Sequence, residues 1–352
     1  MTIVAVVAGS LTLGATRLDA PDPLGASSSA GATGTLADTL GQERTSRSDR
    51  RRERRADAIA VADGGERLGV RPGDPPAAGL VFDLDTGEVL WSRDPHEQRP
   101  VASLTKIMTA VIAAEELRDP ARKVTIGDQV EQTEGSAVGL ERGMRVSVGA
   151  LFQAALIASA NDAATALAEA SAGSERRFVR RMNRRARRLG LDCTRFVSPH
   201  GLEPANRSCA ADMAALTRLA MGVSRIRRIV RKDRTVVDFP IPGGIRYLAS
   251  TNPLLQTGYV GTIGMKTGYT PAAGRSLSAV VRRDGRTLGA VVLDSKEPGP
   301  LVESLLDATF EDRERDGRRV RDARRRKAAD PAGRRTRGRA VAGARTAGRG
   351  VS

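Results

Sequence analysis

The sequence predicts an α+β fold, in which an antiparallel sheet is flanked by helices and accompanied by an all-helical subdomain. Three observations favour it. Strand-like segments joined by turn residues occur near both ends of the region 76–310, and the residues between them have helical periodicity. In addition, only 10 of the 352 residues are aromatic, so the core must rest on Ala, Val, Leu and Ile. A core rich in Ala is typical of a helix-rich protein.

Four strands are expected, arranged as two hairpins. They are Gly79–Asp83, Glu88–Ser92, Leu277–Val281 and Thr287–Leu293. Asp85-Thr86-Gly87 forms the turn of the first pair. Asp284-Gly285 forms the turn of the second pair and is the strongest hairpin signal in the chain. A further strand carries Lys266 and leads into a turn.

Helices are expected between the two hairpins and after the second one. The predicted segments are Ser103–Leu117, two pieces of Leu151–Ser171 on either side of Ser159–Asp162, Ser174–Leu189, Ala210–Gly222 and Pro300–Phe310. Apolar side chains recur on one face of the first helix, at Leu104, Ile107, Met108 and Val111.

Composition divides the chain into four parts. Residues 1–16 contain a short apolar stretch that resembles the hydrophobic region of a secretory signal, which predicts an exported, extracytoplasmic protein. Residues 17–75 lack sustained periodicity and are expected to form a disordered linker. Residues 76–310 form the folded domain, and residues 311–352 form a basic, disordered tail.

The formal net charge of +16 is concentrated in the flanks. Residues 311–352 carry fifteen basic and six acidic residues, and residues 43–56 carry seven and three. The tail is therefore expected either to attract an anionic envelope surface or to be solvated without a partner. Arginines also crowd one face of the helix at 174–189. Because no aromatic residues are interleaved with them, we interpret this face as solvated and expect no specific nucleic-acid partner.

Several classes of protein are excluded by what the sequence lacks. No run of 18 apolar residues exists, so the chain is not a polytopic membrane protein and no transmembrane anchor is evident. Two cysteines and two histidines do not supply a typical metal centre, and no cofactor or metal is expected. Cys193 and Cys209 leave two states open, free thiols or a disulfide that would stabilise the fold by about 3 kcal/mol.

The strongest chemical signal begins at Ser103-Leu104-Thr105-Lys106. This spacing places a hydroxyl and an amine on one helix face, one turn apart. Serine is a weak nucleophile until an adjacent base takes its proton. Lysine can be that base if it is neutral, a state that burial among apolar neighbours and a second nearby cation both favour.

Two further motifs follow in a fixed order. Ser159-Ala160-Asn161 lies 56 residues after Ser103, and Lys266-Thr267-Gly268 lies 107 residues after Ser159. Each motif alone has a structural explanation, such as helix capping or a solvent-facing strand residue. The order Ser-x-x-Lys, Ser-x-Asn, Lys-Thr-Gly is the pattern of penicillin-binding proteins and class A β-lactamases.

With these motifs the chain resembles the low-molecular-weight penicillin-binding proteins, which are serine-type D-alanyl-D-alanine carboxypeptidases. The resemblance covers about residues 76–310. The segments that carry it are Asp85–Leu90, Pro100–Thr109, Phe178–Val179, Met182–Asn183, Leu189–Gly190, Pro199–Leu202, Asp212–Met213, Thr251–Leu255, Gly264–Thr270 and Ala273–Gly274. The resemblance implies the serine DD-peptidase/β-lactamase-like fold.

The resemblance also implies roles for eight residues. Ser103 would be the acylated nucleophile, Lys106 its base and Ser159 the proton relay to the leaving amine. Asn161, Lys266, Thr267, Gly268 and Tyr269 would bind the substrate, and the N–H groups of Ser103 and Tyr269 would form an oxyanion hole. The implied substrates are peptidoglycan stem peptides, with β-lactam antibiotics as covalent inhibitors.

Other interpretations were weighed against a DD-carboxypeptidase. A DD-endopeptidase would share every motif, whereas a β-lactamase needs a deacylating Glu that the sequence does not offer convincingly. A wall-binding protein without activity and a basic nucleic-acid binder are disfavoured by the intact motifs and by the charge distribution. His200 invites a Ser–His interpretation, but it matches a structural loop, and no chemical role is expected for His96.

Overall fold

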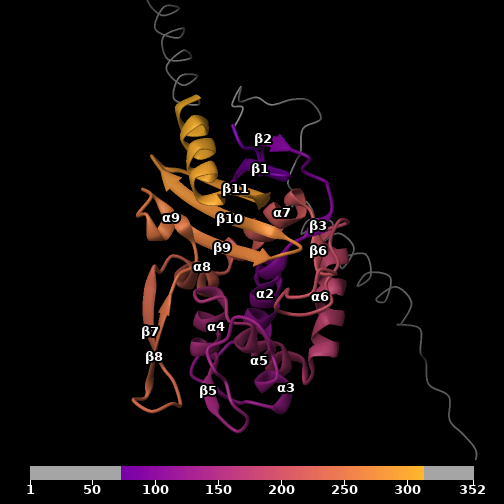
Figure 1. Cartoon of the computed structure of the whole chain (residues 1–352), viewed down its shortest axis with the longest axis vertical. Helices are drawn as coiled ribbons and strands as arrows, with labels where there is room; N and C mark the ends of the chain where they lie inside the picture. The colour runs from indigo at the N-terminus through magenta and orange to yellow at the C-terminus, as the bar shows by residue number, and fades with distance from the viewer. Residues whose placement is uncertain (1–72, 313–352) are drawn as a thin grey trace, which may run out of the picture. The chain divides into compact units, whose positions relative to one another are not determined.

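The computed structural model describes residues 73–312, and its main sheet has five antiparallel strands in the order β2–β1–β11–β10–β9 (Figure 1). The strands are β1 (Ala78–Asp83), β2 (Val89–Arg93), β9 (Thr262–Thr270), β10 (Gly274–Arg283) and β11 (Arg286–Ser295). Both predicted hairpins are confirmed, and they join through the pairing of β1 with β11. The α+β prediction is therefore correct, and β9, which carries Lys266, is an edge strand.

The predicted helices are present with small differences at their ends. They are α2 (Lys106–Glu116), α4 (Val148–Leu156), α5 (Asn161–Ala172), α6 (Glu175–Leu189) and α7 (Ala210–Gly222), and α8 (Ser224–Val230) follows α7. The segment expected to be one helix from Ser103 opens instead with a short 3-10 turn, η1 (Ala102–Thr105), before α2. The positive φ of Ala102, 45°, explains this irregular start.

The last described helix spans residues 298–312, so it is longer than the prediction at both ends. Residues 311 and 312, which the prediction placed in the tail, belong to this helix. The rest of that predicted tail, the predicted signal region 1–16 and residues 17–72 of the predicted linker lie outside the described residues. No helix among residues 73–312 combines the length and apolar character that crossing a bilayer requires.

Several short elements were not predicted, because two to five residues do not establish a period. Three pairs of strands form small separate sheets: β3 (Arg99–Pro100) with β6 (Arg207–Ser208), β4 (Lys123–Thr125) with β5 (Arg145–Ser147), and β7 (Arg234–Asp238) with β8 (Ile245–Ala249). Two short helices, α3 (Asp128–Glu131) and α9 (Pro253–Gln256), complete the described chain.

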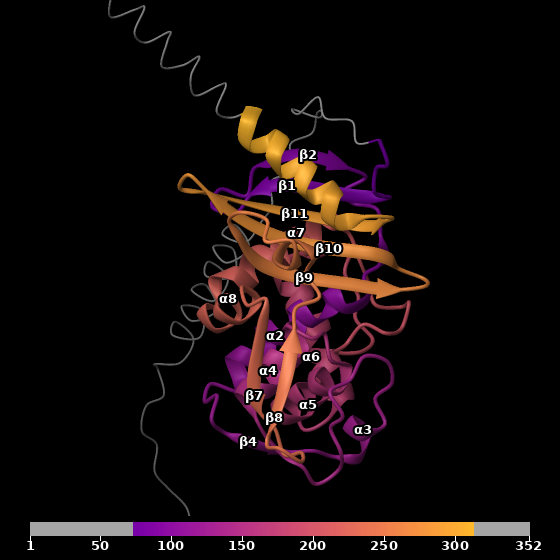
Figure 2. The same ribbon diagram turned by 60° about the vertical axis from the view of Figure 1, so that its left-hand side comes forward.

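The main sheet lies between the helical subdomain and the helix at 298–312 (Figure 2), and an apolar cluster packs on each of its two faces. Side chains alternate between them along β1: Leu80 and Phe82 belong to the cluster shared with the helical subdomain, and Val81 belongs to the cluster under the helix at 298–312. On the helical side, α2 is buried along its first eight residues, from Lys106 to Ala113. The helix that carries the predicted base therefore runs through the core.

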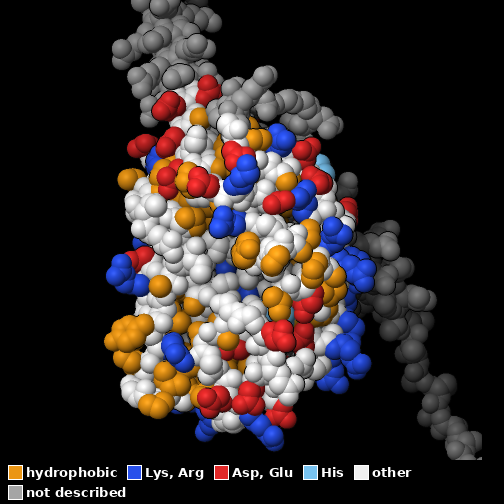
Figure 3. Space-filling view, in the orientation of Figure 1, with side chains coloured by type: hydrophobic (Ala, Val, Ile, Leu, Met, Phe, Trp, Pro, Cys, Tyr) orange, Lys and Arg blue, Asp and Glu red, His pale blue; other side chains and the backbone are white. Residues whose placement is uncertain are grey.

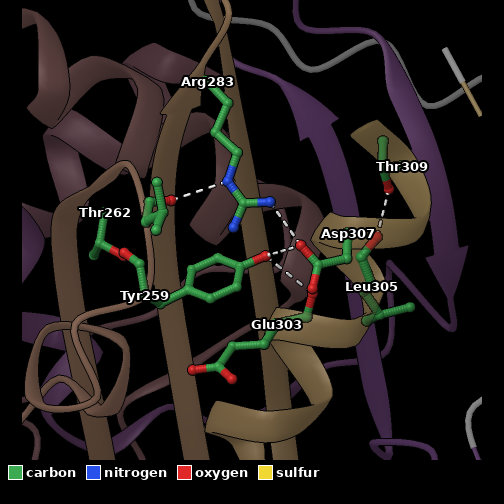
Figure 4. Close-up of polar contacts among 8 residues, drawn as sticks. Tyr259, Thr262, Arg283, Glu303, Leu305, Asp307 and Thr309 are labelled. Carbon is green, nitrogen blue, oxygen red and sulfur yellow. Dashed lines mark hydrogen bonds and ion pairs between the residues drawn. The ribbon is translucent and has the colours of Figure 1, made fainter. Parts of the chain in front are cut away.

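A cluster of polar and aromatic side chains fastens the helix at 298–312 to the sheet (Figure 4). Arg283 of β10 pairs with Asp307 of the helix at 2.6 Å, and the Tyr259 hydroxyl donates to the same carboxylate at 2.7 Å. The Arg283 guanidinium lies 4.3 Å from the centre of the Tyr259 ring and 5.2 Å from that of Phe310. These contacts hold a helix whose first residues line the cleft described below.

The two cysteines, whose state the sequence left open, are joined. A disulfide links Cys193, in the segment after α6, to Cys209, the residue that precedes α7. It closes a loop with a sequence separation of 16 that contains the segment around His200.

We predict that Gly289→Ala destabilises the sheet by about 1–3 kcal/mol, because a Cβ at this position of β11 would lie 2.2 Å from the Phe82 ring. Urea unfolding measures the change. Adding Phe82→Leu should restore part of the loss by making room for the methyl group. Strictly additive effects of the two substitutions would contradict the contact.

Candidate active site

Ser103 and Lys106 meet at the junction of η1 and α2. Lys106 Nζ donates to Ser103 Oγ at 2.8 Å, to Asn161 Oδ1 at 2.7 Å and to the His200 carbonyl at 2.9 Å. Lys106 is 1% exposed, whereas Ser103 is partly exposed. The buried amine is therefore held by three oxygen acceptors, one of which is the hydroxyl that faces the solvent side.

The turn that presents Ser103 depends on a glycine in a distant loop. Gly201 has a φ of 89°, and a Cβ at this position would lie 1.9 Å from the Ala102 carbonyl oxygen and 2.7 Å from Thr105 Oγ1. Only a residue without a side chain allows this approach. The loop at 198–202 can thus lie against η1 and place the His200 carbonyl on Lys106.

Ser159 and Asn161 come from the connection between α4 and α5. Ser159 is 9% exposed and has a φ of 62°, which turns the chain sharply before α5 begins at Asn161. The Asn161 side chain accepts from Lys106 and donates through Nδ2 to the Glu134 carbonyl at 2.8 Å. The middle motif therefore contacts the first motif directly.

The third motif lies on β9, at the free edge of the sheet. Lys266 Nζ donates to Ser159 Oγ at 2.9 Å and to the Thr267 carbonyl at 2.8 Å. Gly268 lies against η1, where a Cβ would be 2.9 Å from the Val101 carbonyl oxygen. Thr267 Oγ1 lies 2.5 Å from Thr251 Oγ1. The close approach of Gly268 to η1 brings the edge of β9 beside the turn that carries Ser103.

Burial changes the acid–base properties of both lysines. Desolvation lowers the pKa of Lys106 well below its ordinary value, and the positive charge of Lys266 lowers it further, while Asp162 and Glu203 act in the opposite direction. Desolvation alone lowers the pKa of Lys266 to about 7. The structure thus favours a neutral amine at Lys106, whose two N–H groups can donate to Asn161 and to the His200 carbonyl while its lone pair accepts from the Ser103 hydroxyl.

The three motifs border one cleft of about 690 Å³. Ser103, Ser159, Thr267, Gly268 and Tyr269 line it, and the buried Lys106, Asn161 and Lys266 lie behind this lining. Of the eight predicted residues, Tyr269 is the most open, with 64% of its surface exposed. All eight predicted site residues are therefore brought together.

Several residues of the cleft were not assigned by the sequence analysis. Ser136, Thr251 and Arg275 line it, together with the segment 296–300 at the start of the last described helix. Thr251 lies in the segment Thr251–Leu255, which resembles the penicillin-binding proteins, so the sequence did contain a signal for its position near the site. Ser136 and Arg275 have no sequence signal, because they reach the cleft through the fold of a loop and through pairing between β9 and β10.

Within the described part of the chain, no hydrogen bond joins a histidine ring to Ser103 or Lys106. The His200 ring is buried and its Nδ1 accepts from the Leu202 N–H at 3.2 Å, while burial lowers its pKa to about 4. Its carbonyl, not its ring, contacts Lys106. Within residues 73–312, one group has the spacing of metal ligands, His96 with Cys193 and Cys209, and both of its sulfur atoms belong to the disulfide.

Comparison with known proteins gives a consistent result. Residues 76–297 match the model of the D-alanyl-D-alanine carboxypeptidase family. The carboxypeptidase DacF of Bacillus subtilis is 35% identical over 243 residues, which span 66% of this chain and 61% of the relative. A D-alanyl-D-alanine endopeptidase of Haemophilus influenzae is 29% identical over 220 residues, which span 61% and 74% of the two chains.

Among solved structures, a D-alanyl-D-alanine carboxypeptidase of Mycobacterium tuberculosis superposes with a TM-score of 0.64 and 31% identity, covering 72% of this chain and 96% of that one. The fold is thus that of the serine DD-peptidases. Since the family model matches well over half of its residues, the chain belongs to the D-alanyl-D-alanine carboxypeptidase family.

We predict that Lys266→Met makes stability less dependent on pH. An unfolded lysine has a pKa of about 10.4, and the pKa of folded Lys266 is about 7. Between these values the unfolded chain binds a proton that the folded chain does not, so the free energy of unfolding rises with pH. Denaturant unfolding at pH 7, 8 and 9 should show a shallower rise in Lys266→Met.

The matched control is Lys123→Met, which removes an exposed lysine. The free energy of unfolding of Lys123→Met should rise with pH as steeply as that of the wild type. Equal slopes in the wild type and Lys266→Met would contradict the lowered pKa of Lys266.

Proposed function

We propose that the chain is a serine D-Ala-D-Ala carboxypeptidase that removes the terminal D-alanine from peptidoglycan stem peptides. The observation that carries the proposal is the contact of 2.8 Å between Ser103 Oγ and the buried Lys106 amine, beside an open cleft. Family membership supports the same activity. The catalytic domain would be residues 76–310.

In the acylation step, Ser103 Oγ attacks the carbonyl carbon of the penultimate D-alanine while neutral Lys106 accepts the hydroxyl proton. The C–N bond then breaks as Lys106 returns this proton through Ser159, which gives its own hydroxyl proton to the departing amine nitrogen and takes up the one from Lys106. The contact between Lys266 and Ser159 supports this relay, because it orients the Ser159 hydroxyl. Water attacks the ester of Ser103 and releases the shortened peptide.

Substrate binding is proposed along β9. Lys266 and Thr267 would hold the terminal carboxylate, and Asn161 a substrate amide. The Thr267 carbonyl accepts a hydrogen bond from Lys266 Nζ. Residues two positions apart in a strand direct their backbone N–H and C=O groups to the same edge. The Tyr269 N–H would therefore lie on the same edge as the Thr267 carbonyl and form the oxyanion hole with the Ser103 N–H. Gly268, which lacks a side chain, lets the peptide lie close to the strand as an additional strand.

The proposal extends to the setting of the enzyme. An exported, extracytoplasmic location fits a peptidoglycan substrate, and β-lactams would acylate Ser103 as covalent inhibitors. The basic residues at 311–352 would attract an anionic envelope surface with a strength that falls as salt increases.

A DD-endopeptidase is the second candidate, because the endopeptidase of Haemophilus influenzae is also similar to this chain. Such an enzyme would use the same nucleophile and cut the cross-link between two stem peptides. A soluble pentapeptide ending in D-Ala-D-Ala and a purified cross-linked dimer, offered at equal concentration, separate the two activities by their kcat/KM values.

We predict that Ser103→Ala lowers kcat/KM for D-alanine release by at least about 10³-fold, because the nucleophile is lost. Release of D-alanine from the pentapeptide is the measurement. Ser304→Ala, an exposed serine on the helix at 298–312, is the control and should retain wild-type activity. Absence of D-alanine from the wild type, or equal rates for wild type and Ser103→Ala, would rule out the proposed enzyme.

We further predict that labelled penicillin forms a long-lived adduct on Ser103. Peptide mass spectrometry should locate the label on the peptide that contains Ser103, and Ser103→Ala should carry none. Rapid turnover of the penicillin without accumulation of the adduct would identify a β-lactamase instead.

A further inference from the structure

An unpaired row of arginines runs along the outer face of α6. Arg176, Arg180, Arg184 and Arg188 are all exposed and follow one another at intervals of four residues. We name them the outer arginine row. Within residues 73–312, none of the four side chains has a hydrogen-bond or ion-pair partner. This surface lies outside the cleft, and the inference does not depend on the proposed peptidase activity.

The inner edge of the same helix is organised differently. Arg181 pairs with Glu116 at 2.8 Å, and Arg185 pairs with Glu115 at 3.2 Å, so these arginines fasten α6 to the end of α2. The two acidic residues neutralise the inner edge and leave the outer row uncompensated. Figure 3 shows the resulting basic side chains gathered along the right-hand edge of the molecule, over α6.

The outer arginine row does not stabilise the helix, since like charges four residues apart repel each other. Its geometry is regular: four residues advance about 6 Å along a helix, so the four side chains span about 18 Å. Four residues also make slightly more than one turn, and the row therefore winds slowly around α6. A partner must match a line of charges and not a single point.

We propose that the outer arginine row binds a linear phosphodiester polymer. The guanidinium group donates in a fork that fits phosphate oxygens. A glycerol phosphate unit has six backbone bonds, twice the number in an amino-acid residue, so it extends to about 7 Å. Successive phosphates of such a polymer would therefore meet successive arginines of the row.

Two other anionic partners fit the surface less well. The large apolar side chains of α6 pack inward: Phe178 and Met182 are buried and Leu189 is partly buried against the core, so the helix has no fully exposed large apolar group to insert into a bilayer. Its sequence contains one aromatic residue, the buried Phe178, which leaves none for stacking on nucleic-acid bases. A flexible polymer without bases needs only charge and spacing.

The test compares three forms of the full chain. One is the wild type, and one carries Arg176→Gln, Arg180→Gln, Arg184→Gln and Arg188→Gln. The matched control carries Arg122→Gln, Arg145→Gln, Arg207→Gln and Arg231→Gln. These substitutions remove the same charge from four exposed arginines outside α6, none of whose side chains has a hydrogen-bond or ion-pair partner among residues 73–312. Fluorescence anisotropy measures the Kd of labelled poly(glycerol phosphate) at several salt concentrations, and the thermal midpoint of each variant checks that it is folded.

Log K for the polymer should fall linearly with the logarithm of the salt concentration. We expect this slope to become shallower by about 3 in the row variant, as for the loss of four phosphate contacts. In the control it should change by less than about 1. Activity on a soluble peptide should be unchanged in both variants. Equal polymer binding by the row variant and the control would overturn the proposal. Two further probes, a single-stranded oligonucleotide and anionic lipid vesicles, are measured in the same way. Tighter binding of the oligonucleotide than of the polymer through the row would also overturn the proposal, and so would a row variant that binds vesicles more weakly but the polymer as well as the control does.

Discussion

The architecture of the site depends on keeping two lysines out of water within one cluster of hydrogen bonds. Burying an ammonium group is costly, and the cost appears as the lowered pKa values of Lys106 and Lys266. Each amine retains oxygen acceptors that tolerate a neutral as well as a charged donor. The fold therefore gives up stability at neutral pH to keep a base available beside Ser103.

This arrangement requires backbone to approach backbone at two places. Gly201 brings the loop at 198–202 onto the Ser103 turn, and Gly268 brings the edge of β9 onto the same turn from the other side. Two of the non-glycine residues with positive φ, Ala102 and Ser159, lie at the two bends that carry the hydroxyl groups. Rigid elements hold these bends, since α2 is buried along most of its length and β9 pairs with β10 over eight residues.

Positive charge has different roles in the cleft and on the surface of α6. In the cleft, burial and the nearby positive charge of Lys266 lower the pKa of Lys106, which keeps it available as a base. On α6, the outer arginine row is exposed and regularly spaced, which suits the recognition of a polymer. The arginine-rich composition alone did not distinguish these roles. The structure separates arginines that fasten α6 from those that are open to a partner, because Arg181 and Arg185 form ion pairs and the outer arginine row does not.

Much of the fold followed from the sequence, because long segments have a clear period. The hairpin around Asp284-Gly285 and the amphipathic helix after Ser174 each carry enough residues to establish their pattern. The short strand pairs and the 3-10 turn at Ala102 did not, since local sequence this short is ambiguous and distant contacts decide it. The state of Cys193 and Cys209 was open for the same reason: a disulfide depends on the distance between two segments.

The sequence by itself determined the identity of the chemical groups and the order of the three motifs, because covalent order and residue type are properties of the chain. Tertiary structure decided how they act. Three features arise only when segments far apart in the chain pack together: the depth at which Lys106 is buried, its contact with the His200 carbonyl, and the entry of Ser136, Thr251 and Arg275 into the cleft. Desolvation and backbone approach depend on everything that surrounds a residue, and no local pattern encodes that surrounding.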